Sequence, residues 1–214
     1  MEQGLGNRNV LSPKGEAQNS YQGVGSFVFE VIKIIILAFI IILPIRIFLF
    51  QPFFVQGASM EPNFEDGQYL IVNELGFKET NISFNSHELF RVNSFREIER
   101  QRVVVFRYPL DTTKFFIKRV IGLPGEKVQV KDGQVTIFNS DQPGGFQLDE
   151  KAYLPSGLRT VGDLTITLGD DQYFMLGDNR MFSSDSRFWG PVPKKDIIGE
   201  VALRTWPLDK ISKF

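Results

Sequence analysis

The run from Val31 to Phe50, VIKIIILAFIIILPIRIFLF, constrains the fold of this chain more than any other feature of the sequence. Between Ile34 and Ile45 every residue except Pro44 is apolar. With its flanks the run has about 20 residues, enough to cross a bilayer as a helix. Lys33 and Arg46 lie near its two ends, where long basic side chains reach the lipid headgroups. The run therefore predicts one membrane-spanning helix.

A buried core helix and a cleaved signal peptide are the alternatives to an anchor. A core helix would rarely be so uniformly apolar without a polar face. The small-residue stretch Val55–Gly57 would suit signal cleavage, but about 30 residues precede the run, and the run exceeds an ordinary signal core. We therefore expect an uncleaved anchor, and we expect the chain to divide into a flexible tail (1–26), a transmembrane anchor (27–50) and a β-rich catalytic domain (51–214).

The distribution of basic residues predicts which way the anchor points. Arg8, Lys14 and Lys33 lie on its amino side, whereas no Lys or Arg follows Arg46 until Lys78. Lys and Arg are enriched in cytoplasmic segments of membrane proteins. We expect a single-pass protein with a cytoplasmic amino terminus and an extracytoplasmic domain.

Composition excludes several classes of function. The chain has no cysteine, which removes disulfides, thiol nucleophiles and Cys-ligated metal sites. Its one histidine, His87, lies in the polar segment NISFNSHELFRVN, where we expect an exposed loop or helix-end side chain. A net charge of −1 without a basic cluster argues against nucleic acid as a partner.

Short alternating apolar runs separated by turn residues follow the anchor, which predicts a mainly β domain of antiparallel, barrel-like sheets. Leu123–Gly125 places Pro and Gly where a type II turn prefers them, and Asp132-Gly133 marks a hairpin. We expect one short helix near Ser94–Arg102. Two stretches look like insertions or excursions from the core: 76–100 and about 131–170.

Lys118 lies in the strand sequence FFIKRVI, where alternation places Phe116, Lys118 and Val120 on one face. Burying an ammonium is costly unless it is paired or neutralised, so a lysine on an apolar face is unusual. Lowering its pKa by about three units would make it a usable base at neutral pH, at a cost of about 4 kcal/mol. The alternative is an edge-strand lysine whose amine lies in water.

Ser59 lies in the segment QGASMEP, shortly after the anchor. A serine hydroxyl is a poor nucleophile until a base takes its proton, and a neutral lysine is the natural candidate in this composition. Gly57 and Ala58 leave room for a substrate backbone, and Pro62 favours a strand end or an irregular turn. The alternative is an ordinary loop serine.

A third polar segment, LGDNRMFSSDSRFWGP, runs from Leu176 to Pro191. Its alternating Arg, Asp and Ser residues end on a bulky Trp-Gly-Pro, which favours an ordered hydrogen-bonded network over a solvated loop. Taken in order behind one anchor, the segments resemble bacterial type I signal peptidases of family S26, which are membrane-anchored serine endopeptidases with a Ser-Lys dyad. The segments that carry the resemblance are IRIFLFQPFFVQGASMEP, VVVFRYP, FFIKRVIGLPGE and YFMLGDNRMFSSDSRFWGPVP.

The resemblance implies a role for each residue of the site. Ser59 would attack the scissile carbonyl to form an acyl-enzyme, and Lys118 would act as its general base. Ser183 would hydrogen-bond and orient the lysine. The Ser59 backbone N–H would supply one oxyanion donor. Some relatives have a serine two residues earlier as a second donor, but here that position is Gly57, so its backbone N–H or no group would serve.

The resemblance also implies two supporting ionic contacts, Asp185 with Arg187 and Asp178 with Arg119. Where Asn63 stands, after Pro62, threonine is common in the family. No mechanistic role is attached to Asn63 on the sequence alone.

The partners implied by the resemblance are preproteins with small residues at positions −1 and −3 of the signal peptide, the lipid bilayer and the protein export machinery. The implied location is the bacterial plasma membrane, and no cofactor or metal is implied. From Phe50 to Ser59 the chain spans at most about 30 Å, so the site is expected near the membrane surface. Phe53, Phe54 and Met60 would either contact the bilayer or pack in the core.

Two other classes of protein fit parts of the pattern. A LexA-like self-cleaving repressor would also use a Ser-Lys dyad, but it would need a DNA-binding domain where this chain has an anchor. A membrane-anchored β-rich binding module would not need Ser59 or Lys118, and both residues are present.

Overall fold

The computed structural model describes residues 16–214 except 49, 78–79, 85–86 and 93, and within 16–24, 43–50 and 78–93 it describes the backbone alone. The chain forms two compact units, Met1–Ile45 and Arg46–Phe214. Each unit is described by itself below.

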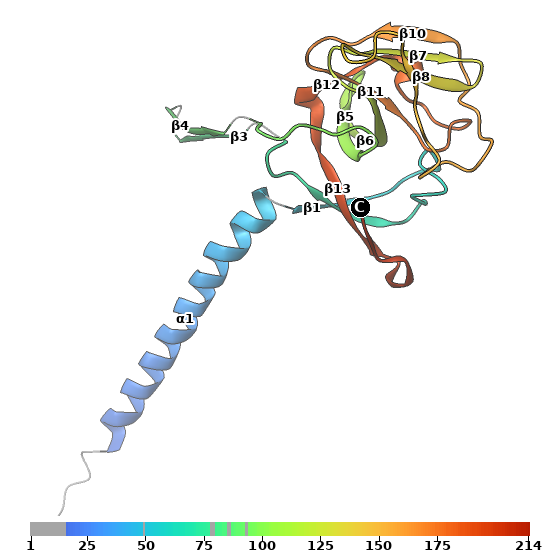
Figure 1. Ribbon diagram of the computed structural model, residues 1–214. Helices are drawn as coiled ribbons and strands as arrows, with labels where there is room; N and C mark the ends of the chain where they lie inside the picture. The colour runs from blue at the N-terminus through green and yellow to red at the C-terminus, as the bar shows by residue number, and fades with distance from the viewer. Residues whose placement is uncertain (1–15, 49, 78–79, 85–86, 93) are drawn as a thin grey trace, which may run out of the picture. The chain divides into compact units, whose positions relative to one another are not determined.

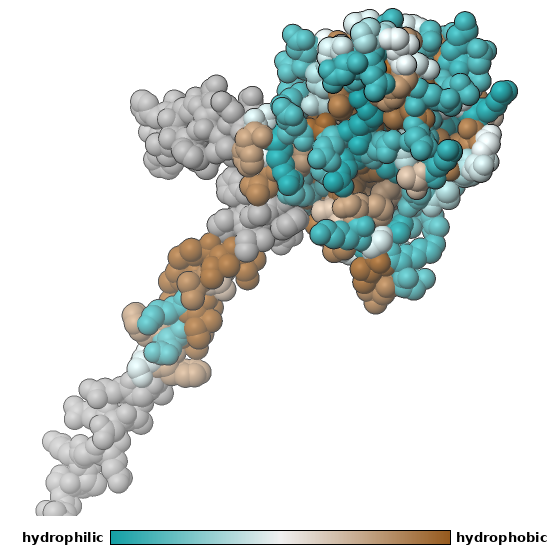
Figure 2. Space-filling model, in the orientation of Figure 1, coloured by the Kyte–Doolittle hydropathy of each residue, from teal (hydrophilic) through white to brown (hydrophobic). Residues whose placement is uncertain are grey.

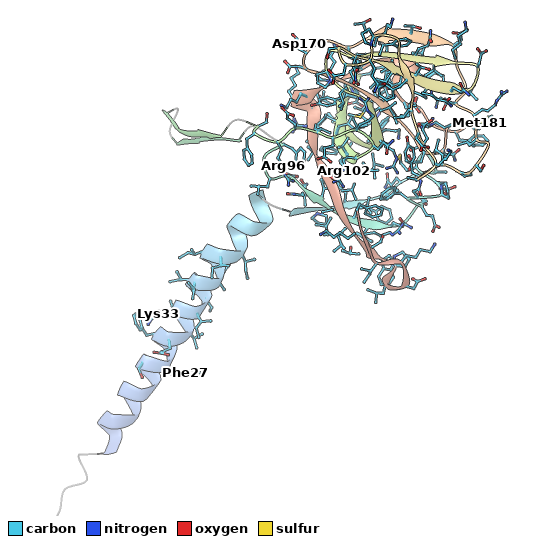
Figure 3. All side chains as sticks on the ribbon, viewed as in Figure 1. Phe27, Lys33, Arg96, Arg102, Asp170 and Met181 are labelled. Atoms are coloured by element: carbon cyan, nitrogen blue, oxygen red, sulfur yellow. The ribbon has the colours of Figure 1, made fainter. Side chains whose placement is uncertain are left out.

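The first unit is built on helix α1, Glu16–Phe48. Its window Gly25–Ile42 is long and apolar enough to cross a membrane, and none of the window is buried. Figure 2 shows the apolar surface of this helix, and Figure 3 shows Phe27 and Lys33 projecting from it. The helix includes residues 16–26 of the expected flexible tail (1–26), because each residue added to an existing helix gains a backbone hydrogen bond. Residues 1–15 of that tail lie outside the described residues.

The second unit is mostly antiparallel β-sheet, as predicted (Figure 1). The large sheet has the order β1-β2-β13-β5-β6-β11-β12, with β14 paired to β13. A four-stranded sheet has the order β10-β7-β8-β9, and β3 pairs with β4. The strands of the large sheet are β1 (Phe50–Phe54), β2 (Tyr69–Asn73), β5 (Val103–Tyr108), β6 (Asp111–Gly122), β11 (Gln172–Leu176), β12 (Val192–Pro193), β13 (Ile197–Trp206) and β14 (Ser212–Lys213).

The remaining elements are short. They are β3 (Thr80–Phe84), β4 (His87–Val92), β7 (Lys127–Lys131), β8 (Gln134–Phe138), β9 (Phe146–Gln147), β10 (Leu164–Thr167), helix α2 (Ser186–Trp189) and the 3-10 helices η1 (Lys194–Asp196) and η2 (Leu208–Lys210).

Both turns that the sequence marks are confirmed. Asp132 and Gly133 have φ angles of 51° and 83°, and they join β7 to β8 as a tight hairpin. Gly125 has a φ of 77°, and the Glu126 N–H donates to the Leu123 carbonyl at 3.2 Å, as in a type II turn.

Residues 131–170 carry strands β8, β9 and β10, which form a second sheet with β7, and this sheet shares an apolar core with the large sheet. β6 and β11 of the large sheet contribute Ile121 and Phe174, and β7 and β8 contribute alternate inward residues such as Val128 and Ile137. Alternation along each strand places these apolar side chains on one face. The two sheets therefore pack together through one apolar cluster.

Three local expectations are corrected or decided by the structure. His87 begins strand β4 rather than lying in a loop, and its side chain is outside the described set. Residues 94–102 are not helical, because Gln101 has a φ of 68°, which a right-handed helix does not allow, and β5 begins directly afterwards. Met60 is fully buried in a core cluster, so core packing is its correct interpretation, whereas Phe54 is half-exposed.

Candidate active site

Ser59 lies in a tight turn that the hydrophobic core holds in place. The turn follows β1 and its neighbours Met60 and Phe64 are fully buried, with the Phe64 N–H donating to the Met60 carbonyl at 2.9 Å. Farther out, the Val55 N–H donates to the Gln68 carbonyl at 2.9 Å and closes the loop. Met60 is buried directly after Ser59, whereas Ser59 itself stays partly exposed. The serine lies in an irregular turn after a strand, as Pro62 led us to expect.

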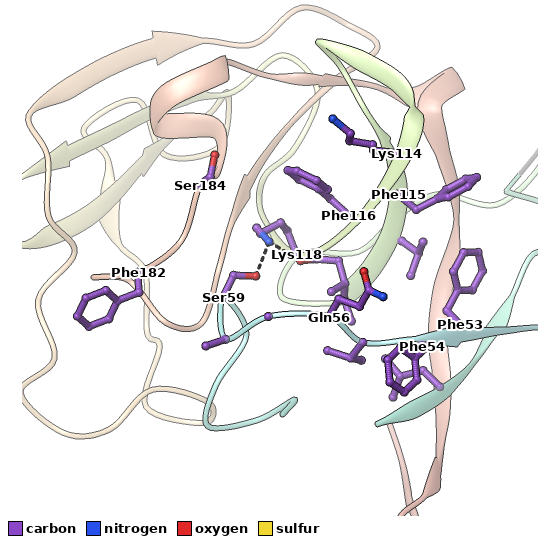
Figure 4. A pocket seen from close by; sticks show the side chains of 16 residues that line it. Phe53, Phe54, Gln56, Ser59, Lys114, Phe115, Phe116, Lys118, Phe182 and Ser184 are labelled. Carbon is purple, nitrogen blue, oxygen red and sulfur yellow. Dashed lines mark hydrogen bonds between the residues drawn. The ribbon is translucent and has the colours of Figure 1, made fainter. Parts of the chain in front are cut away.

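Lys118 reaches this serine from strand β6. Its Nζ lies 2.7 Å from Ser59 Oγ and donates to the Ile117 carbonyl at 2.8 Å (Figure 4). The side chain is only 3% exposed, and burial lowers the pKa of Lys118 to about 8, against the opposing effect of Asp185 and Asp178. The lysine is therefore buried, and it is not the edge-strand residue of the alternative interpretation.

The dyad opens onto a cleft of about 690 Å³ between the 53–59 segment and strand β6 (Figure 4). Buried Val55, Leu70 and Val105 give part of its lining an apolar character. The other lining residues are Phe53, Phe54, Gln56, Gly57, Ala58, Ser59, Lys114, Phe115, Phe116, Ile117, Lys118, Phe182 and Ser184.

Asp178 connects the strand of the lysine to the turn of the serine. The Arg119 guanidinium donates to both carboxylate oxygens of Asp178, at 2.8 and 2.6 Å. The Asn63 side-chain amide donates to the same carboxylate at 2.9 Å and to the Tyr153 carbonyl at 2.6 Å. Asn63, to which we attached no role on the sequence alone, is therefore part of the site. Its one sequence signal is its place four residues after Ser59.

Asn179 binds the turn that carries Ser59 directly. Its backbone N–H donates to the Ser59 carbonyl at 3.1 Å, and its side-chain amide donates to the Ala58 carbonyl at 3.0 Å. These bonds attach the polar segment 176–191 to the turn that carries the serine. The sequence analysis placed Asn179 in that segment without assigning it a contact.

Asp185 and Arg187 form a buried ion pair within the same segment. The guanidinium donates to the carboxylate through two nitrogens, each at 2.8 Å. Asp185 also accepts the Gly177 N–H at 3.0 Å, and its side chain caps helix α2. The pair thus holds Gly177, which lies between the end of β11 and Asp178.

Ser183 does not make the bond that the resemblance implied. Its Oγ is buried and has no hydrogen-bond partner among the described residues, while Lys118 Nζ bonds to Ser59 and Ile117. Ser183 packs instead against Gly177, where an added Cβ would lie 2.1 Å from Ser183 Oγ. Lys118 is instead oriented by the Ile117 carbonyl of its own strand and by Ser59.

Gly57 does not offer a free donor to an oxyanion. Its N–H donates to Asp66 Oδ1 at 2.6 Å, and its φ of 84° is one that glycine adopts readily. The Ser59 N–H, in contrast, has no acceptor within the described part of the chain. The sequence left two alternatives for a second oxyanion donor, the Gly57 backbone N–H or no group. That N–H is already bound to Asp66.

A further ionic contact was missed because its partners are far apart in sequence. Arg180 is fully buried and pairs with Glu150, and it donates to the Thr160 hydroxyl and to the Gly177 carbonyl. Glu150 and Thr160 belong to the stretch we expected to be an excursion. No local pattern in that stretch indicated a link to the site.

Comparison with known proteins shows the family of this chain. A family model described as "Signal peptidase, peptidase S26" matches residues 28–206. The chain belongs to this signal peptidase family. Relatives include a probable signal peptidase I-2 of Synechocystis sp., 32% identical over 85% of this chain and 75% of its own. A signal peptidase I P of Bacillus subtilis subsp. natto is 33% identical over 87% of this chain and 93% of its own.

Among solved structures, the chain is similar to a signal peptidase I from Enterococcus faecalis V583. It is 29% identical, with a TM-score of 0.41, and the match covers 51% of this chain and 100% of that chain.

Gly177 offers a test of how tightly this signal peptidase site is packed. A Cβ there would lie 2.4 Å from the Ser59 carbonyl oxygen, so Gly177→Ala must displace the nucleophile turn. Overpacking of this kind costs about 1–3 kcal/mol of unfolding free energy. Denaturant unfolding of Gly177→Ala measures this loss of stability. Gly144→Ala is the control, because a Cβ at Gly144 meets nothing within 4 Å. Equal stability of the two variants would contradict the described packing.

Proposed function

We propose that this protein is a membrane-anchored serine endopeptidase that removes amino-terminal signal peptides from exported preproteins. The observation that carries the proposal is the 2.7 Å contact between Ser59 Oγ and a buried lysine amine inside a cleft. Membership of the signal peptidase family supports the substrate class.

In the acylation step, neutral Lys118 accepts the Ser59 hydroxyl proton while Oγ attacks the scissile carbonyl carbon. The carbonyl π electrons move to oxygen and give a tetrahedral oxyanion. The Lys118 ammonium then donates that proton to the leaving amine as the carbon–nitrogen bond breaks, which leaves the signal peptide as an ester on Ser59. With a pKa of about 8, roughly one lysine in ten is neutral at pH 7.

In the deacylation step, neutral Lys118 takes a proton from a water molecule, and the hydroxide attacks the ester carbonyl. Collapse of the second tetrahedral intermediate breaks the ester bond, and Lys118 returns the proton to Ser59 Oγ. The enzyme thus recovers its starting state, and the signal peptide leaves as a carboxylic acid that releases its proton to water and becomes a carboxylate. One group serves as base and then as acid in each step.

The Ser59 N–H is the oxyanion donor in this proposal, because it has no other acceptor in the described chain. The Gly57 N–H would first have to leave Asp66. A single backbone donor is consistent with the proposed chemistry. The positive charge of the Lys118 ammonium, close to Ser59, also stabilises the oxyanion.

The cleft suits an extended peptide with small side chains. β5 pairs with one edge of β6, while β11 pairs with the other edge only at Arg119 and beyond. The edge from Lys114 to Ile117 is therefore not paired by another described strand, and a substrate backbone can hydrogen-bond there. The apolar lining from Val55 and Val105 favours small apolar side chains at −1 and −3.

The candidate membrane span explains why such a site would be anchored. Gly25–Ile42 exposes an apolar surface that a bilayer would cover. A signal peptide is itself embedded in the membrane. An enzyme anchored in the same membrane can therefore bind it close to the lipid surface. We propose a cytoplasmic amino terminus and an extracytoplasmic catalytic domain at the bacterial plasma membrane, close to the protein export machinery.

Removing either member of the dyad is expected to abolish cleavage. Ser59→Ala and Lys118→Ala should each lower the rate of preprotein cleavage in detergent by about 10³-fold or more, as triad knock-outs do in other serine proteases. Lys131→Ala is the control, because Lys131 is an exposed lysine on β7 outside the cleft. Wild-type rates in Ser59→Ala or Lys118→Ala would refute the proposal.

The rate should also follow the protonation of Lys118. Only the neutral amine can act as base, so kcat/KM should rise about tenfold per pH unit at low pH and level off above a pKa of about 8. Measuring cleavage of one preprotein between pH 6 and 10 checks this. A profile already flat at pH 6, or one still rising at pH 10, would contradict a base with this pKa.

A further inference from the structure

Three apolar side chains in the polar segment 176–191 are strongly exposed. The exposed fractions are 59% for Met181, 80% for Phe182 and 77% for Phe188. Met181 lies at the periphery of the domain (Figure 3). Of the three, Phe182 is the one that lines the catalytic cleft. An exposed phenylalanine next to a nucleophile leaves apolar surface available to a ligand in that cleft.

The backbone holds Phe182 at a defined place relative to the nucleophile. Its N–H donates to the Asn179 carbonyl at 3.0 Å, and the Asn179 N–H donates to the Ser59 carbonyl at 3.1 Å. The Asn179 amide also donates to the Ala58 carbonyl at 3.0 Å. The Phe182 turn and the nucleophile turn are therefore joined by hydrogen bonds through one residue.

Phe182 lies on the opposite side of Ser59 from Phe53 and Phe54 (Figure 4). Under the proposed function, the residues before the scissile bond occupy the side lined by β6 and by the 53–56 segment. A peptide that continues in an extended form past Ser59 carries the residues after the scissile bond toward Phe182.

We propose that Phe182 is a specificity-determining residue, which contacts the first residues after the scissile bond and favours apolar or aromatic side chains there. The inference rests on the proposed function and names a preference of the same site. An apolar residue covers the ring and removes apolar surface from water, while a charged residue placed there loses hydration without gaining a partner.

Peptide kinetics with a matched control tests the preference. Peptides identical up to the scissile bond carry Leu, Phe, Gly or Asp at the two following positions. Wild-type enzyme should cleave the Leu and Phe peptides with kcat/KM about tenfold above the Asp peptide, the effect of about 1.4 kcal/mol of apolar burial. Phe182→Ala should remove most of this difference, whereas Phe188→Ala should keep it. An unchanged difference in Phe182→Ala would overturn the proposal.

Photo-crosslinking separates this inference from the proposed function. Phe182→p-benzoylphenylalanine and Phe188→p-benzoylphenylalanine are made in a Ser59→Ala background, so no turnover is needed. Mass spectrometry of the irradiated peptide complex should locate crosslinks from position 182 on the residues after the scissile bond, and none from position 188. Crosslinks to the preceding residues, or none, would overturn the inference even if wild type cleaves preproteins. Crosslinks as expected without any wild-type cleavage would instead refute the proposed function alone.

Discussion

The desolvation of Lys118 beside Ser59 is the interaction on which the rest of the site depends. Burial lowers the pKa of this lysine to about 8, although two carboxylates, Asp185 and Asp178, act in the other direction. Each carboxylate is itself bound by a guanidinium, Arg187 for the first and Arg119 for the second. Because these arginines neutralise the carboxylates, the lysine is left without a strong counter-ion, and the effect of burial dominates.

One segment brings the two members of the dyad together, although they lie far apart in the sequence. Asp178 binds Arg119, the neighbour of the lysine, and Asn179 binds the carbonyl of the serine. Gly177 leaves no space for a side chain between this segment and the nucleophile turn. The distance between Lys118 Nζ and Ser59 Oγ therefore depends on the close backbone contact at Gly177 and on the Asp178 carboxylate, which binds both Arg119 and Asn63.

The sequence alone could predict the antiparallel β fold, the apolar helix and the two marked turns, because alternation, length and turn chemistry are local signals. It also singled out Ser59 and Lys118, whose side chains the structure brings to 2.7 Å of each other, although each residue alone had an ordinary alternative. It could not predict that Ser183 makes no hydrogen bond to Lys118, or that the Asn63 amide donates to Asp178. These contacts depend on which segments meet in space, and so does the apolar core that the second sheet shares with the large sheet.

Direct titration of the lysine amines by NMR tests the central claim, that Lys118 is a base tuned by burial. With ¹⁵N-labelled lysine, the Lys118 Nζ signal is assigned by its loss in Lys118→Met. Lys114 provides an internal reference, because pairing with Asp111 raises its pKa. The account predicts that Lys118 titrates near pH 8 in the micelle-bound chain, well below Lys114. Titration of both amines above pH 10 would contradict it.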